Sequence, residues 1–378
     1  MKNKSRWIIS IIFLILAPII AVMHQIKGGG PEGSPSVDAL CPFGGLETLP
    51  TLFSSGEYIP KITPSAFILL IAVVILTFIL GKAFCGYICP LGTIQSLMNK
   101  LARKLHIKQI KIPEKLDKPL RLVKYFVLFL VVFLTYKAGE LIIRPYDPWA
   151  AFMHLTSGTE VFEEFLIGVI ILIALLIASM FVERAFCRYL CPLGAALSIT
   201  SRFRIFNIKR NPSSCINCKA CTRNCPMGLD VLSSDSVSKS ECISCGECIS
   251  TCPVNNTLEN KKGKLILSPN KSALIAILSL ALMIVGTLAT ENFKTSLSNT
   301  ETLSQEGVLN PENIKGYMTI NDVAKEFNLP VEKLLEKSNL PKDTDLNTPM
   351  KDLVEVLASK GVEFDTSTIR ETVEELLK

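Results

Sequence analysis

Charge is scarce in this chain. Asp, Glu, Lys and Arg together make up 20% of the 378 residues, whereas hydrophobic residues make up 49% and the mean hydropathy is +0.38. A chain of this size with that balance is too apolar for an ordinary soluble protein. The composition therefore indicates a protein that lies largely in a membrane.

The apolar residues gather in five stretches without a charged residue. These stretches are residues 7–23, 62–81, 125–136, 165–182 and 272–290. A spanning helix needs roughly 17–25 apolar residues, and the third stretch reaches that length only if Arg121, Lys124 and Lys137 extend toward the membrane surfaces. We expect five spanning helices rather than the buried helices of a soluble protein. No convincing small-x-small cleavage site follows the first stretch, which argues against a removable signal peptide.

Lysine and arginine are scarce on one of the two sides that these spans define. Residues 82–121 contain nine of them and residues 183–271 contain thirteen, whereas residues 27–63 and 137–161 contain two each. Basic loops remain in the cytoplasm. We therefore expect a multi-pass protein of the cell (inner) membrane with its N-terminus and its cysteine-rich stretch in the cytoplasm. If the fifth stretch spans, residues 291–378 lie outside.

The thirteen cysteines lack the spread pattern of a disulfide framework. Eight lie between Cys215 and Cys252 in tight Cys-x-x-Cys spacing. That spacing favours metal binding by thiolates, which requires a reducing compartment.

Two runs within this stretch match the bacterial ferredoxin pattern, in which three close cysteines and a Cys-Pro from the other run hold each [4Fe–4S] cube. The pattern assigns one cluster to Cys215, Cys218, Cys221 and Cys252, and the other to Cys242, Cys245, Cys248 and Cys225. Zinc motifs rarely repeat three cysteines at this spacing, so a pair of zinc sites is the weaker alternative.

A second cysteine pattern is duplicated. "AFCGYICPLG" (residues 83–92) and "AFCRYLCPLG" (residues 185–194) are identical at eight of ten positions, 102 residues apart. Upstream, "CPFGGLETL" from Cys41 aligns with "DPWAAFMHL" from Asp147. Both halves have the same orientation, so we expect a parallel repeat about a pseudo-two-fold axis along the membrane normal.

The proline after each repeat's second cysteine predicts a helix start, because proline is favoured at the first helical position. Cys89 and Cys191 then lie at N-caps, where the helix dipole favours a thiolate. The helix after Cys89 has an apolar face and basic residues elsewhere, so we expect it on the inner membrane surface.

Three roles remain open for Cys85, Cys89, Cys187 and Cys191. They could converge and bind a further cluster or metal, they could act as redox-active dithiol pairs, or they could be small buried residues that cap and pack.

Histidine is far scarcer than charge, with three residues in the chain. His24 and His154 are expected near the outer surface, where they could carry quinone protons or ligate haem, although a lone interfacial histidine usually does neither. Arg144, Asp147 and Trp149 could shape an outer quinone or cofactor pocket. Cys41, the one cysteine expected outside, is a helix cap or a ligand there.

The expected fold is mostly α: a polytopic helical membrane protein with a cytoplasmic two-cubane ferredoxin-like (α+β) domain and a small all-α tail. We divide it into a four-helix membrane domain (1–205), the ferredoxin-like domain (206–262), a fifth spanning helix (272–290), a linker (291–312) and a small helical domain (313–378). In the last domain, Thr319 is expected to cap the first of two short helices. Its two-helix turn is not strongly basic, so we expect a protein partner and no nucleic acid.

Residues 1 to about 260 resemble the membrane polyferredoxin family that includes NapH and the membrane part of NosR. The resemblance rests on two Cys-x-x-x-Cys-Pro repeats at the inner ends of spans, followed by the two ferredoxin runs. It implies a membrane electron carrier with quinol as a frequent donor. The fifth span and residues 291–378 depart from the family.

We therefore predict a membrane-bound iron–sulfur protein with two [4Fe–4S] clusters. It would relay electrons between the cytoplasmic-side ferredoxin module and a membrane quinone, quinol or partner oxidoreductase, as an electron-transfer component of the quinol dehydrogenase type. No residue is assigned a catalytic role. The alternative is a non-enzymatic accessory or redox-sensing factor for maturation of a partner metalloenzyme.

Overall fold

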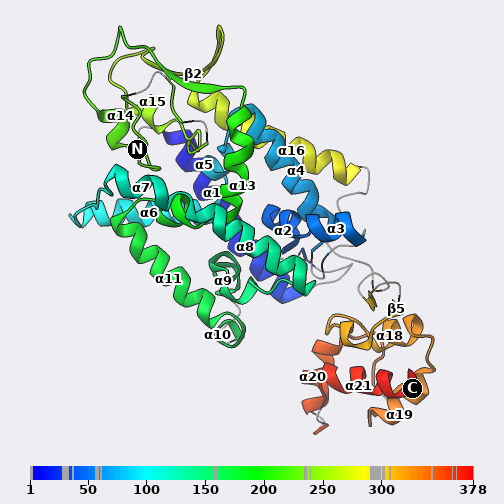
Figure 1. The fold of residues 1–378 in the computed structure, drawn as a ribbon. Coiled ribbons are helices and arrows are strands. Elements are labelled where there is room, and N and C mark those ends of the chain that lie inside the picture. The colour runs from blue at the N-terminus through cyan, green and yellow to red at the C-terminus, as the bar shows by residue number, and fades with distance from the viewer. Residues whose placement is uncertain are drawn as a thin grey trace. The chain divides into compact units, whose positions relative to one another are not determined.

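A computed structural model of the chain shows two compact units. The first comprises Met1–Val22 and Val37–Phe293, and the second comprises Met23–Ser36 and Lys294–Lys378. The structure describes residues 3–27, 34–35, 38–55, 59, 62–156, 160–233, 236–238, 240–289, 299, 303–305, 308–341, 344–359, 361–362 and 364–377. The ferredoxin stretch and the apolar helices belong to the same unit (Figure 1).

Each of the five apolar stretches forms a helix. They are α1 (Lys4–Lys27), α4 (Pro64–Leu80), α8 (Val123–Ala138), α11 (Leu166–Phe181) and α16 (Pro269–Ala289). Three helical segments are long and apolar enough to cross a membrane: Lys4–Lys27, Glu114–Ala138 and Pro269–Leu288. α4 and α11 are apolar but shorter, at 17 and 16 residues. The chain is thus a mostly helical membrane protein, while its sidedness stays a prediction.

Short helices connect the apolar ones on the side expected to face outward. They are α2 (Pro42–Glu47) and α3 (Leu49–Ser55) before α4, and η2 (Arg144–Tyr146), α9 (Pro148–His154) and α10 (Glu160–Glu164) before α11; η1 (Asp38–Leu40) precedes α2. α2 and α9 both begin with a proline, as the aligned sequences predict. Asp147 caps α9 by accepting a hydrogen bond from the Trp149 backbone N–H at 2.9 Å, whereas the Cys41 side chain makes no cap bond.

At the other end of each half, a five-residue helix leads into a longer one. α5 (Ala83–Tyr87) precedes α6 (Pro90–Lys104), and α12 (Ala185–Tyr189) precedes α13 (Pro192–Thr200) and η3 (Ser201–Phe203); α7 (Glu114–Leu120) leads into α8. α6 packs against α11 with its polar Gln95, Ser96 and Asn99 buried, while the apolar Leu101 and Leu105 are exposed. The polar face of α6 is therefore buried against the rest of the protein.

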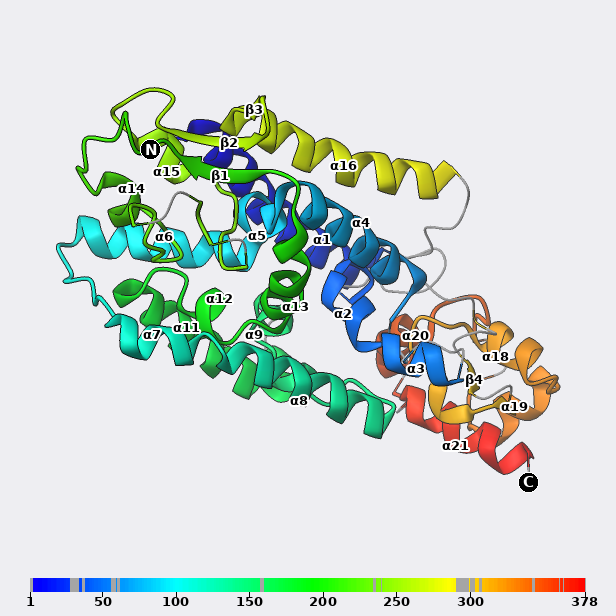
Figure 2. The ribbon, with the colours of Figure 1, turned by 45° about the horizontal axis from the view of Figure 1, so that its top comes forward.

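The ferredoxin stretch is held by a three-stranded antiparallel sheet. β1 (Asn207–Arg210) pairs with β2 (Leu258–Lys262), and β2 pairs with β3 (Leu265–Leu267), with Ile208 opposite Asn260 and Lys261 opposite Ile266. Between β1 and β2 lie the two cysteine runs with their short helices α14 (Ala220–Arg223) and α15 (Glu247–Thr251). α16 follows β3 directly and runs beside α4, so the sheet joins the ferredoxin module to the apolar helices (Figure 2).

The second unit has its own apolar core. It contains β4 (Ser304–Gln305), β5 (Val308–Leu309), η4 (Pro311–Asn313), α18 (Ile320–Glu326), α19 (Val331–Lys337), α20 (Met350–Ser359) and α21 (Thr366–Leu377). Thr319 caps α18 in a capping box with Asp322, as the sequence predicts. Most of the predicted linker, residues 291–312, lies outside the described residues, but Leu303 is buried in this core.

The helices of the second unit come in two related pairs that the sequence analysis missed. The Asn321 N–H donates to the Leu346 carbonyl at 3.2 Å, and the Lys351 N–H donates to the Gly316 carbonyl at 2.8 Å. Donor and acceptor are exchanged between positions 30 residues apart, and Thr319 and Pro349 form the antiparallel bridge between them. The α18–α19 pair thus meets the α20–α21 pair through reciprocal backbone bonds.

Candidate iron–sulfur centres

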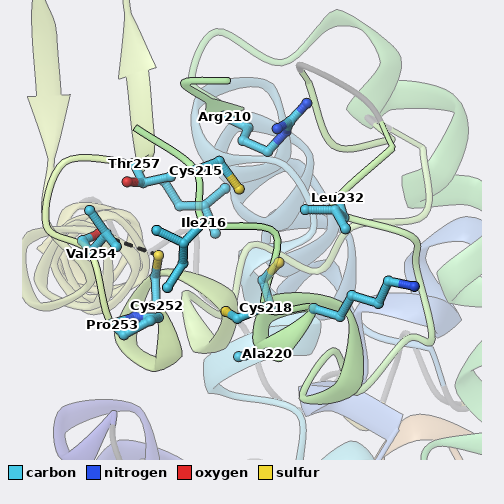
Figure 3. Close-up of a pocket in the computed structure, with 13 residues that line it drawn as sticks. Arg210, Cys215, Ile216, Cys218, Ala220, Leu232, Cys252, Pro253, Val254 and Thr257 are labelled. Carbon is cyan, nitrogen blue, oxygen red and sulfur yellow. Dashed lines mark hydrogen bonds between the residues drawn. The ribbon is translucent and has the colours of Figure 1, made fainter. Parts of the chain in front are cut away.

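One pocket of the ferredoxin module is lined by four cysteines. They are Cys215, Cys218, Cys221 and Cys252, the four that the sequence pattern assigns to one cluster (Figure 3). Cys252 belongs to the second cysteine run, and Figure 3 shows that it lines the same pocket as Cys215 and Cys218. Cys218 is exposed and Cys215 is partly buried, so this pocket faces solvent.

The other four cysteines pack into a buried core. Cys242, Cys245 and Cys248 are each 7% exposed, and Cys225 packs against them. Burial, together with the neighbouring Cys245 thiolate, raises the pKa of Cys225 to about 12. The pKa of Cys215 is instead lowered, by the Asn217 backbone N–H and by Arg210. The first set is therefore open to solvent at Cys215 and Cys218, although its Cys221 is also 7% exposed, whereas no cysteine of the second set is exposed.

The two cluster loops share one backbone conformation. Asn217 and Lys219 have φ values of 54° and 58°, and Ser244 and Gly246, each 27 positions later, have values of 52° and 69°. Alternation of left-handed residues with ordinary ones turns backbone N–H groups toward an anion. The Ser244 N–H donates to the Cys242 sulfur at 3.4 Å, which is the expected result.

These residues fit [4Fe–4S] clusters. Each set offers three thiolates from one loop and one from the other run, and backbone N–H groups are directed at the sulfurs, as in the Leu229 N–H to Cys225 contact at 3.4 Å. A bound cluster would supply one-electron chemistry. Across the described ranges, no group of three or more Cys, His, Asp or Glu side chains is arranged to hold a single metal ion.

The duplicated cysteines take the same place in both halves. Cys89 is the N-cap of α6 and Cys191 the N-cap of α13, which confirms the prediction from the proline positions. The Gly194 N–H donates to the Cys191 sulfur at 3.3 Å, and the Gly92 N–H does the same for Cys89. Each sulfur thus lies at the positive end of a helix dipole.

The fold brings the two cysteine pairs together. Burial raises the pKa of Cys85 to about 11, and the thiolate of Cys187 in the other half adds to the rise. Burial also raises the pKa of Cys191, again with contributions from Cys187 and Cys85. The four thiols therefore interact across the boundary between the halves, although 102 residues separate them in sequence.

Reciprocal hydrogen bonds flank this cysteine group. The Lys82 ammonium donates to the Ser198 hydroxyl at 2.9 Å, and the Arg184 guanidinium donates to the Ser96 hydroxyl at 2.9 Å. Lys82 and Arg184 are matching positions, as are Ser96 and Ser198, and both cations are 1% exposed. From the sequence alone, these cations contribute only to the positive charge of the inner side. Their shared position just before each repeat was the signal that could have identified them.

The first repeat meets the ferredoxin module through a close backbone approach. A Cβ on Gly86 would lie 2.4 Å from the Ile243 carbonyl oxygen and 3.4 Å from the Cys245 Cα, so this close approach requires glycine. Cys85, beside it, packs against both the apolar-helix core and the ferredoxin core. The N-terminal segment secures the contact, since the Asn3 amide donates to the Cys245 carbonyl at 2.9 Å and Arg6 donates to the Gly86 carbonyl at 3.2 Å.

In the second repeat the matching residue is Arg188. Its guanidinium donates to Asp117 at 2.6 Å, and the Tyr189 hydroxyl donates to the same carboxylate at 2.6 Å. A Cβ on Gly228, in the ferredoxin module, would lie 2.7 Å from the Arg188 guanidinium. The second repeat therefore meets the module through a charged side chain.

A buried ion-pair group fixes the second cysteine run. Glu241, directly before Cys242, accepts from the Lys124 ammonium at 2.7 Å and from Arg121 at 3.2 Å. Burial by itself would raise the pKa of Glu241, but Lys82, Lys124 and Arg121 lower it below its usual value. The carboxylate is therefore charged and ties the cluster loop to α8.

The outer candidates are only partly brought together. His154 stacks on Phe165 with 4.5 Å between ring centroids, and Arg144 lies over the same ring at 5.7 Å. Trp149 packs beside Phe152 on α9, next to the cap Asp147. Cys41 is the N-cap residue of α2. His24, which contacts the Ser34 carbonyl at 2.8 Å, belongs to the second unit.

Two family models match this chain. The model described as "4Fe-4S binding domain" matches residues 62–108 and again residues 165–211, so each match contains one repeat. The model described as "4Fe-4S dicluster domain" matches residues 207–253. No solved structure matches the chain significantly.

Known relatives match about half of the chain. The putative electron transport protein YccM of Escherichia coli is 36% identical over 216 residues, 54% of this chain and 56% of the relative. An uncharacterized protein of Methanocaldococcus jannaschii is 40% identical over 195 residues, 51% of this chain and 75% of the relative. The ferredoxin-type protein NapH of Haemophilus influenzae is 31% identical over 188 residues, 48% of this chain and 62% of the relative.

The chain thus spans little more than half the length of YccM, and less of other relatives such as protein NirI of Paracoccus denitrificans, of which it covers 30%. The family models, the relatives and the duplicated cysteine pairs nevertheless agree. The chain belongs to the NapH/NosR-type family of membrane polyferredoxins, iron–sulfur proteins of electron transport.

Proposed function

We propose that the protein is a membrane electron relay in which three thiolate sites lie in series. The open site of Cys215 is at one end, the buried site of Cys242 follows, and the four repeat cysteines come last. The observation that carries this order is the contact of Gly86 with the loop of Cys245, directly beside Cys85. Two [4Fe–4S] clusters are the cofactors of the first two sites.

The two halves of the apolar part form a parallel pseudo-two-fold repeat. The reciprocal bonds from Lys82 to Ser198 and from Arg184 to Ser96 support this arrangement, because a two-fold axis exchanges donors and acceptors in this way. The repeat cysteines lie where the halves meet, which is where repeat membrane proteins tend to have their sites.

The repeat cysteines form one shared site for a further cluster or metal. Support comes from the electrostatic interaction among all four thiols and from the N–H groups at Cys89 and Cys191. The two other roles, dithiol pairs and packing, predict different chemistry. A dithiol pair would give up two electrons and two protons to an acceptor and form a disulfide within one half, and packing would leave all four thiols inert.

The relay continues from the repeat cysteines to a membrane quinone or quinol, or to a partner oxidoreductase. The names of NirI, NosR and NapH do not identify such a partner, so its identity rests on experiment. The ferredoxin module lies in the cytoplasm and the second unit outside, as the distribution of Lys and Arg indicates. A protease or thiol probe that cannot cross the membrane should then reach residues 313–378 in intact spheroplasts.

Iron and sulfide analysis with EPR redox titration of anaerobically purified protein tests the relay. The ferredoxin runs should bind about eight iron and eight acid-labile sulfide per chain, and a shared repeat site would add to the iron. Cys218→Ser should damage one cluster and spare most of the other. Zinc in place of iron would overturn the proposal.

A regulatory or accessory role is the second candidate. One relative is named regulatory protein NosR, with 35% identity over 143 residues, and the second unit folds around its own core. Deleting residues 313–378 separates the two functions. A relay should keep its electron-transfer rate from the ferredoxin clusters, whereas a sensor should keep its redox chemistry and lose its regulatory output.

A further inference from the structure

The open cluster site has an apolar centre at its solvent-facing end. Ile216, between Cys215 and Cys218, is 63% exposed, and Leu232 lines the same pocket. Cys218 itself is exposed, so a cluster held there would lie close to whatever covers this surface. An exposed isoleucine beside a redox site is the kind of apolar contact found at the middle of transient protein interfaces.

Basic side chains surround this centre. Arg210 and Lys219 line the pocket, and Figure 3 shows the Arg210 guanidinium beside Cys215. Arg223 is exposed and donates to the Cys218 carbonyl at 3.2 Å, which holds its charge next to the cluster loop. Among the described residues that line the pocket, none is acidic.

The nearest acidic residues of the module are engaged by its own groups. The Asp230 carboxylate accepts from the backbone N–H groups of Leu232 at 3.0 Å and Ser233 at 3.3 Å. Glu259 pairs with Lys261 at 3.0 Å. Glu241 and Glu247 face inward, to Lys124 and Arg6. Among the described residues around the open site, the charge is therefore mostly positive, with Arg210, Lys219 and Arg223 against Asp230.

From this arrangement we propose that the surface around Ile216 is the docking site for a small, soluble, acidic electron-carrier protein. The inference rests on the proposed relay, because it identifies the partner at the relay's open end. A small patch with an apolar middle and a basic rim suits a weak, fast complex. Opposite charges steer such partners together and orient their redox centres.

The experiment uses the full, cluster-loaded chain in nanodiscs of neutral lipid. An acidic two-[4Fe–4S] ferredoxin is the probe, a basic c-type cytochrome is the negative probe, and binding is measured by biolayer interferometry over a range of salt concentrations. We expect the affinity for the ferredoxin to fall roughly tenfold between about 20 and 300 mM salt, since the Debye length shortens over this range.

Charge reversal locates the surface. Lys219→Glu and Arg223→Glu should each weaken ferredoxin binding by about fivefold or more, by the strength of close charge pairs at such interfaces. Lys264→Glu is the matched control, because Lys264 is exposed on the turn between β2 and β3 and does not line the pocket. It should change the affinity less than twofold. The visible and EPR spectra of each variant show whether its clusters remain intact.

Several results would overturn the docking site. They are no binding of the ferredoxin at low salt, an equal loss in Lys264→Glu, or equal binding of the basic cytochrome. Capture of anionic-lipid vesicles with the same sensitivity to Lys219→Glu would instead identify a membrane-facing surface. If the clusters titrate normally while the ferredoxin does not bind, the relay stands and only the docking site fails. If no clusters are present, the relay itself fails.

Discussion

The two Cys-x-x-x-Cys-Pro repeats have nearly the same sequence but different neighbours. Of their ten positions, only Gly86/Arg188 and Ile88/Leu190 differ. Glycine in the first repeat admits the Ile243 carbonyl and the loop of Cys245, whereas Arg188 in the second reaches Asp117 and Gly228. The two repeats therefore meet the ferredoxin module in different ways, and Gly86 and Arg188, which differ between them, make these contacts.

The largest effect should come from replacing one cysteine of the repeat group, in either half of the chain. If the four thiols share one site, Cys85→Ser and Cys187→Ser should have the same consequence, because loss of any ligand disables a shared centre. We expect both variants to lose the iron above the ferredoxin complement and to slow electron transfer to the membrane acceptor at least about 100-fold, as loss of a ligand or its support does in metal sites.

Gly286→Ala is the control, since Gly286 lies in α16 outside both cysteine groups and a Cβ there would meet no atom within 4 Å. Iron content, EPR and the rate of quinone reduction are measured on the same preparations. Unequal effects of the two repeat variants would show that the pairs act separately. A disulfide detected within one half would then favour the dithiol role.

The next effect concerns the asymmetric contact. Gly86→Ala introduces a Cβ that overlaps the Ile243 carbonyl oxygen, and the backbone of the Cys245 loop cannot rotate away as a side chain would. Overpacking of this kind costs about 1–3 kcal/mol. We expect a lower unfolding temperature and slower electron transfer from the buried cluster to the repeat site.

Gly286→Ala serves as its control, because a Cβ at Gly286 in α16 meets no atom within 4 Å. It should leave both measurements within error, or raise the unfolding temperature slightly through the better helix propensity of alanine. An unchanged transfer rate in Gly86→Ala would show that this contact is not the route between the sites.

Much of this comparison was accessible from the sequence. The helices, the caps at Cys89, Cys191 and Asp147, and the cysteine grouping around the open pocket follow from apolar length, proline positions and cysteine spacing. These features are local, or depend on a known ligand pattern.

The contacts between distant segments were not accessible. Nothing near Gly86 in the sequence specifies Ile243 as its neighbour, because the contact joins two polar backbones with no characteristic side chain. Lys82 was assigned to a basic inner loop, yet Ser198 and Glu241 offset the cost of burying it. The sequence predicted α6 on the inner membrane surface, and it did not indicate that Gln95, Ser96 and Asn99 are buried, because the neighbouring α11 is remote in sequence.

A smaller effect, on the midpoint potential of a cluster, should distinguish Lys82 from its matching cation Arg184. Lys82 interacts with both Cys85 and Cys242, whereas Arg184 interacts with Cys85 and Cys89 of the repeat site. A nearby cation stabilises the reduced, more negative state of a cluster. Lys82→Met should therefore lower the midpoint potential of the buried ferredoxin cluster by on the order of 50 mV, from a Coulomb interaction at an effective dielectric of about 20.

Arg184→Met should leave that potential unchanged, and Lys82→Arg should restore it because the charge returns. EPR-monitored redox titration of the three variants measures the shifts. Equal shifts in Lys82→Met and Arg184→Met would mean that the two halves contact the ferredoxin cluster equally, which contradicts the asymmetry drawn from Gly86 and Arg188.

The smallest effect lies at the outer ends of the halves, where Asp147 and Cys41 occupy matching caps. Asp147 accepts a hydrogen bond from the Trp149 N–H, and removal of such a cap costs about 1 kcal/mol, so Asp147→Ala should lower the unfolding temperature measurably. The Cys41 side chain makes no cap bond, so Cys41→Ala removes none, and Cys41→Asp should stabilise α2 by supplying a cap acceptor. Thermal unfolding in detergent measures all three. If Cys41→Ala keeps its stability but loses quinol-linked reduction of the clusters, Cys41 is a ligand of an outer site and the two caps differ in function as well as strength.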